Sequence, residues 1–152
     1  MTSLVIYDSQ FGNTQKVAGQ IARGAGAVLM PLSEAGQTDW SSLSLLVVGS
    51  PTHGGRPSQL VQQLLNRIPQ NALHGIRAAA FDTGMAAEGQ KFFIRMIIGF
   101  FGYAAKRTAA LLTVKGAAVI ASETFFVRGK EGPLIEGEER RAYEWGQHLG
   151  KI

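Results

Sequence analysis

Four short apolar runs in this sequence are nearly continuous, without the alternation of apolar and polar residues that marks a strand with one wet face. A strand needs apolar side chains on both faces when both faces are covered, as in a parallel sheet between two layers of helices. The runs therefore predict a buried parallel sheet. They are Leu4 to Tyr7, Leu43 to Val48, Ala78 to Phe81 and Ala117 to Ile120.

Helical patterns separate these runs, with apolar residues three and four positions apart. They occur at Val17 to Ala22, at Leu60 to Ile68 and around Trp145 near the end of the chain, and a weaker strand spans Ala27 to Leu32. Strands alternating with helices predict an α/β fold in three layers, a doubly wound sheet covered on both faces. The length of 152 residues and the lack of a linker predict a single domain over residues 1–152.

Cysteine is absent from the chain. This excludes disulfides, thiolate metal sites and a nucleophilic thiol, so any redox chemistry must come from a bound cofactor, and no metal is expected. The sequence opens directly on an apolar run without a basic leader, from which we expect a cytoplasmic location. The formal net charge is +4, but the basic residues form no recognisable nucleic-acid-binding motif, and no nucleic acid partner is expected.

The loops after the strands are considered together, because ligands of doubly wound sheets bind beyond the carboxyl ends of the strands. After the first strand, Ser9-Gln10-Phe11-Gly12-Asn13-Thr14 leads straight into a helix. Hydroxyl and amide side chains beside the free N–H groups of a helix start can hold a phosphate without a lysine. The loop matches neither the nucleoside-triphosphatase nor the dinucleotide-binding glycine pattern. An ordinary turn with Asn13 or Thr14 as helix cap stays open.

Two further loops suit a flat polar ring. The segment Ser50 to Pro57 contains the adjacent Gly54 and Gly55, which let the backbone approach a ring and change conformation at low cost. The segment Asp82 to Met85 offers hydrogen-bonding groups for a ring edge and the soft, apolar methionine side chain. Each loop is commonplace alone, whereas their joint occurrence at three strand ends predicts one site.

With these loops in order, the chain resembles the flavodoxin family over essentially its whole length. The first loop resembles the family's [Ser/Thr]-x-x-Gly-Asn-Thr phosphate loop, and the other two resemble the loops that flank its isoalloxazine ring. The stretch Glu123 to Val127 resembles the short-chain form. The resemblance implies a five-stranded sheet of order 2-1-3-4-5, bound FMN, electron transfer between redox partner proteins, and no catalytic residue. The implied cofactor-binding residues are Ser9, Gln10, Phe11, Gly12, Asn13, Thr14, Pro51, Thr52, His53, Gly54, Gly55, Asp82, Thr83, Gly84 and Met85.

The sequence departs from the family pattern in two ways. Well-studied flavodoxins stack the ring between a Trp and a Tyr, and this chain has His53 and Met85 in those loops, so we expect looser FMN binding. Trp40 and Trp145 lie outside the loops and are expected to pack the core or surface. Flavodoxins are typically acidic and this chain is basic, which favours a less negative potential for the second reduction, since reduced flavin is anionic.

An apolar segment from Phe92 to Tyr103 allows three interpretations. It is buried against the sheet, or it docks a redox partner or a second copy of the chain, or its Phe92 to Phe101 part binds a membrane surface. The segment also supports an alternative function, an FMN-dependent quinone reductase or a menaquinone-linked oxidase of flavodoxin type. A receiver domain is disfavoured because Asp8 lacks a second acid and Ser50 replaces the phosphorylatable aspartate.

Overall fold

The computed structural model describes residues 2–86 and 103–152. At its centre lies a five-stranded, all-parallel sheet of order β2-β1-β3-β4-β5. This confirms the parallel sheet that the apolar runs predict and the strand order that the family resemblance implies. The strands are β1 (Thr2–Tyr7), β2 (Val28–Pro31), β3 (Leu43–Pro51), β4 (Arg77–Met85) and β5 (Ala118–Val127).

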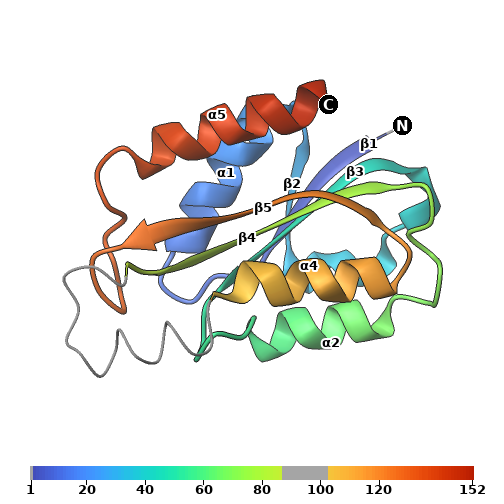
Figure 1. The fold of residues 1–152 in the computed structure, drawn as a ribbon, viewed down its shortest axis with the longest axis horizontal. Helices are drawn as coiled ribbons and strands as arrows, with labels where there is room; N and C mark the ends of the chain where they lie inside the picture. Colours follow the sequence, from blue (N-terminus) through green and yellow to red (C-terminus); the bar gives the residue numbers. More distant parts are fainter. Residues whose placement is uncertain (1, 87–102) are drawn as a thin grey trace.

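Helices cover both faces of the sheet, as a doubly wound fold requires. Figure 1 shows α1 (Asn13–Ala25) and α5 (Glu138–Lys151) on one face, with α2 (Gln59–Arg67) and α4 (Ala104–Val114) on the other. Two 3₁₀ helices, η1 (Leu32–Gln37) and η2 (Trp40–Ser42), connect β2 to β3. Within the described residues, each helix is too short or too polar to cross a membrane.

The side chains of β3 show how the continuous apolar runs build the core. Leu46 and Val48 pack in the cluster beneath α2 and α4, whereas Leu45 and Val47 pack in the cluster beneath α1 and α5. All four side chains are fully buried. Successive residues of a strand point to opposite faces, so a strand between two helix layers needs apolar residues at every position.

The two tryptophans pack the core, as expected from their position outside the loops. The Trp145 ring meets the rings of Phe81 and Phe125 edge-on, with centroid distances of 6.4 and 5.9 Å. Trp40 packs against the cluster on the opposite face. Neither tryptophan lines the pocket described below.

The last strand is longer than the sequence predicts. The apolar run ends at Ile120, where the register with β4 shifts, but β5 continues to Val127, which pairs with Met85 at the end of β4. Residues 87–102 hold most of the apolar segment Phe92 to Tyr103 and lie outside the described residues. The three interpretations of that segment therefore stay predictions.

The contact between α1 and α5 is close enough to exclude a side chain at Gly146. A Cβ there would lie 2.3 Å from the backbone oxygen of Ile21. We expect Gly146→Ala to lower the free energy of unfolding by about 1–3 kcal/mol, the usual cost of overpacking, measured by urea denaturation. Gly19→Ala on α1 is the matched control, because its Cβ would meet only Leu29 Cδ2, at 4.0 Å. Equal losses in the two variants would contradict the prediction.

Candidate functional site

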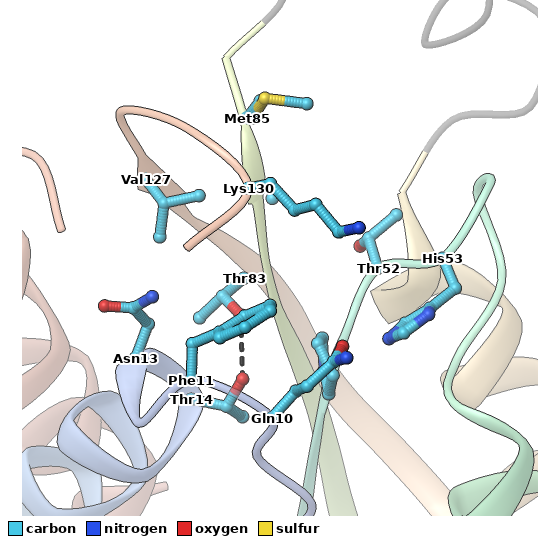
Figure 2. Close-up of a pocket in the computed structure, with 12 residues that line it drawn as sticks. Gln10, Phe11, Asn13, Thr14, Thr52, His53, Thr83, Met85, Val127 and Lys130 are labelled. Carbon is cyan, nitrogen blue, oxygen red and sulfur yellow. Dashed lines mark hydrogen bonds between the residues drawn. The ribbon is translucent and has the colours of Figure 1, made fainter. Parts of the chain in front are cut away.

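A pocket lies beyond the carboxyl ends of the strands, where loops from β1, β3, β4 and β5 meet (Figure 2). Its lining combines uncharged polar side chains with apolar ones and contains neither Asp nor Glu among the described residues. Every lining residue except Val127 and Lys130 is one that the sequence predicts for cofactor binding. The lining residues are Gln10, Phe11, Asn13, Thr14, Pro51, Thr52, His53, Thr83, Gly84, Met85, Val127 and Lys130.

The loop after β1 turns into α1 at Gly12, which has a φ of 91° and makes no side-chain cap. The alternative that Asn13 or Thr14 caps the helix is therefore wrong, since both are already helical residues. In the described part of the chain, the backbone N–H groups of Asn13 and Thr14 have no acceptor. Two N–H groups at the positive end of a helix dipole remain available for an anion.

Ser9 shapes this loop from outside the pocket. Its Oγ accepts hydrogen bonds from the N–H groups of Gly12 (3.1 Å) and Gln15 (3.3 Å). The residue borders a separate hollow of about 450 Å³ beside η1 and α2. The hydroxyl therefore holds the turn that points the start of α1 at the pocket.

The start of α1 is tied to two neighbouring segments. Thr14 Oγ1 lies 2.8 Å from Thr83 Oγ1 of β4 in a buried hydrogen bond, drawn as a dashed line in Figure 2. Asn13 Nδ2 donates to the backbone oxygen of Glu131, 3.0 Å away, in the loop between β5 and α5. These bonds fix the relative positions of three of the loops that form the pocket.

The loop after β3 forms a tight hairpin turn. His53 N–H donates to the oxygen of Arg56 (2.8 Å), and Arg56 N–H donates back to His53 (3.1 Å). The intervening Gly54 and Gly55 have φ values of 58° and 78°, which suit glycine in such two-residue turns. They form the tip of the turn and do not line the pocket, whereas His53 does. Their predicted contact with the ring stays a prediction.

Asp82 lies beneath the pocket and does not line it. Its carboxylate is fully buried and accepts hydrogen bonds from the hydroxyls of Thr52 and Thr124 and from the N–H of Ala104 at the start of α4. Burial raises the pKa of this carboxyl to about 6, although these hydrogen bonds oppose the shift. Asp82 thus joins the loop after β3 to β5 and α4 under the site.

Tyr103 and Lys130 are two residues at the site that the predicted list of cofactor contacts lacks. The hydroxyl of Tyr103 donates to the backbone oxygen of Met85 (2.8 Å), which fixes the end of β4. Lys130 follows β5 and lines the pocket. The other pocket loops were predicted because they directly follow a strand. If the last strand had been predicted to end at Val127 instead of Ile120, the loop that contains Lys130 would have been included too.

A doubly wound parallel sheet with an uncharged anion cradle at the start of α1, beside a partly apolar pocket at its carboxyl edge, defines a mononucleotide-binding α/β protein. The family model described as Flavodoxin matches residues 5–145, and the chain belongs to the flavodoxin family. It is accordingly an FMN-binding electron-transfer protein.

Solved structures share the fold at low sequence identity. Flavodoxin 1 from Bacillus cereus has a TM-score of 0.76 and 17% identity, with 99% of this chain and 98% of that chain covered. A flavodoxin, WrbA-like protein from Agrobacterium tumefaciens has a TM-score of 0.72 and 16% identity, with 99% of this chain and 95% of that chain covered. Two-electron reduced flavodoxin from Megasphaera elsdenii has a TM-score of 0.67 and 19% identity, with 99% of this chain and 100% of that chain covered. No curated protein matches the chain significantly.

The residues present fit FMN. The acceptor-free N–H groups of Asn13 and Thr14 suit the phosphate, which otherwise would need a cationic partner. Phe11, Met85 and Val127 in the same lining offer apolar surface to a ring. The shared pocket places both kinds of surface within one ligand's reach.

Proposed function

We propose that FMN binds non-covalently in this pocket, with its phosphate at the start of α1 and its ring beside the loops after β3 and β4. The observation that carries the assignment is the pair of backbone N–H groups at Asn13 and Thr14 that lack an acceptor where α1 borders the pocket. Among the residues that line the pocket, the proposed phosphate-binding residues are Gln10, Asn13 and Thr14, and the proposed ring-binding residues are Thr52, His53, Thr83, Gly84 and Met85. Ser9, Gly12 and Asp82 are proposed to support them from outside the lining, and ring contact by Gly54 and Gly55 stays a prediction.

Bound FMN supplies one- and two-electron chemistry, and the chain holds it, orients it and tunes it. Phe11 at the pocket is 43% exposed, and His53 is also exposed. A cofactor seated among such residues keeps an edge open to solvent. We therefore propose that electrons enter and leave through this edge, between a reductase and an acceptor that are separate proteins.

Three further assignments stay proposals. The chain is proposed to form a single domain over residues 1–152, and its location to be cytoplasmic, which cell fractionation would test. The proposed homodimer or membrane-surface contact through Phe92 to Phe101 concerns residues outside those described. The alternative function, quinone reductase or menaquinone-linked oxidase, depends on the same segment.

Calorimetry with two ligands tests the cofactor site. We expect the purified protein to be yellow, to release FMN on denaturation, and to rebind one FMN per chain. Riboflavin, which lacks the phosphate, should bind roughly tenfold more weakly or worse, because a charge-assisted hydrogen bond contributes about 1.5–3 kcal/mol. A colourless protein that gives no heat with FMN would contradict the proposal, and equal affinity for both ligands would contradict the phosphate assignment.

A further inference from the structure

Lys130 brings a positively charged side chain to the pocket. It lines the pocket together with uncharged polar and apolar residues and with His53, and the described lining contains no carboxylate. A cation in a lining without acids creates a positive potential at the ligand. Flavin is neutral when oxidised and anionic when fully reduced, so such a cation distinguishes the two states.

The backbone of Lys130 is held in place by its own turn. Gly132 N–H donates to the oxygen of Gly129 (3.0 Å), which places Lys130 second in a four-residue turn. Arg128 N–H donates to the oxygen of Pro133 (2.9 Å), and the neighbouring Glu131 oxygen accepts from Asn13 Nδ2 (3.0 Å). The turn is therefore docked on the phosphate loop, and Lys130 starts from a defined position.

The side chain of Lys130 extends toward the ring-binding side of the pocket. Figure 2 shows it reaching from the loop after β5 in the direction of Thr52, with its amine away from Asn13. The two acceptor-free N–H groups of the phosphate cradle belong to Asn13 and Thr14 at the other end. The lysine charge is thus separated from the phosphate cradle.

The charge of Lys130 is not neutralised by a partner within the described residues. The ion pairs there involve Arg140 and Arg141 of α5, and none includes Lys130. The buried acid beneath the pocket, Asp82, accepts its hydrogen bonds from the hydroxyls of Thr52 and Thr124 and from the N–H of Ala104. The ammonium group is left available for a bound anion.

We propose that Lys130 tunes the cofactor: its ammonium stabilises the negative charge of the fully reduced ring and so raises the potential of the second one-electron reduction. Two electrons from the redox partner and one proton from solvent convert the neutral ring into an anion, and Lys130 acts on the charge that this leaves. The inference rests on the proposed FMN site and deepens it. The less negative second potential is otherwise expected from the basic surface as a whole, and the inference assigns it to one residue in the pocket.

Replacing Lys130 with methionine removes the charge and keeps an unbranched side chain that is one atom shorter. We expect Lys130→Met to weaken binding of fully reduced, anionic FMN roughly tenfold and to leave the binding of its neutral states unchanged, which lowers the potential of the second one-electron reduction by about 59 mV. Arg128→Met is the matched control, because it removes the same charge from the same loop at a residue that is exposed like Lys130 but lies outside the pocket lining. Arg128→Met should shift the second potential by less than a third of the shift in Lys130→Met. Lys130→Arg keeps the charge, and its second potential should stay near the wild-type value. Spectroelectrochemical titration gives the potentials, and calorimetry gives the oxidised affinities.

Three outcomes would overturn the inference. Equal shifts in Lys130→Met and Arg128→Met would assign the effect to overall charge. An unchanged second potential in Lys130→Met would remove any tuning role. A loss of oxidised FMN affinity without a loss of riboflavin affinity would place the ammonium at the phosphate. A wild-type chain that binds no FMN would instead overturn the proposed site, so the two failures are distinguishable.

Discussion

Replacing Thr14 with aspartate is expected to weaken FMN binding by roughly a hundredfold or more, because two like charges about 4 Å apart near a protein surface repel by about 4 kcal/mol. Thr14 lies in the first turn of α1, lines the pocket and is 2% exposed. A carboxylate there would occupy the cradle proposed for the phosphate. Calorimetric titration with FMN measures the loss.

Two controls separate charge repulsion from structural damage. Thr14→Val keeps the shape of the side chain and removes the hydrogen bond to Thr83, so it should cost FMN affinity about tenfold. Riboflavin has no phosphate, and its affinity should fall far less than that of FMN in Thr14→Asp. The aspartate also sits favourably at a helix N-terminus, and urea denaturation verifies that the variant is folded. Undiminished FMN affinity would refute the phosphate assignment of Thr14.

Removing the carboxylate of Asp82 is expected to be the most destabilising single change beneath the site. In Asp82→Ala, the hydroxyls of Thr52 and Thr124 and the N–H of Ala104 lose their shared acceptor. A buried donor without a partner costs about 1–3 kcal/mol, so we expect a loss of about 3 kcal/mol or more in the free energy of unfolding. Urea denaturation at neutral pH measures it, and a loss below about 1 kcal/mol would contradict the role of this network.

The same carboxyl should make stability depend on pH. Burial raises its pKa from 3.8 to about 6, so between these values the folded chain binds more protons than the unfolded chain. Stability therefore falls as pH rises through this window, and Asp82 should make the protein about 1 kcal/mol more stable at pH 5 than at pH 7. Asp82→Asn keeps the shape without titrating, and the difference between wild type and this variant isolates the effect. Parallel pH profiles of the two proteins would contradict it.

Local patterns in the sequence predict the architecture and most of the residues at the pocket. Continuous apolar runs have one physical meaning, a strand covered on both faces, and parallel strands bring their carboxyl ends to one edge. The loops at that edge could therefore be chosen from local pattern alone, and Phe11, Thr14, His53 and Met85 all line the pocket. Family motifs in these loops then indicated FMN.

Contacts between distant segments determine which polar groups hold the loops in place and which line the pocket. Ser9 and Asp82 have the polar side chains of cofactor contacts, yet both bond to neighbouring protein groups outside the lining. Lys130 was missed because the end of β5 at Val127 was not predicted, and its turn is placed at the pocket by docking on Asn13, far away in the sequence. Hydrogen-bond partners and charge placement depend on contacts between distant segments, and local residue patterns do not encode those distances.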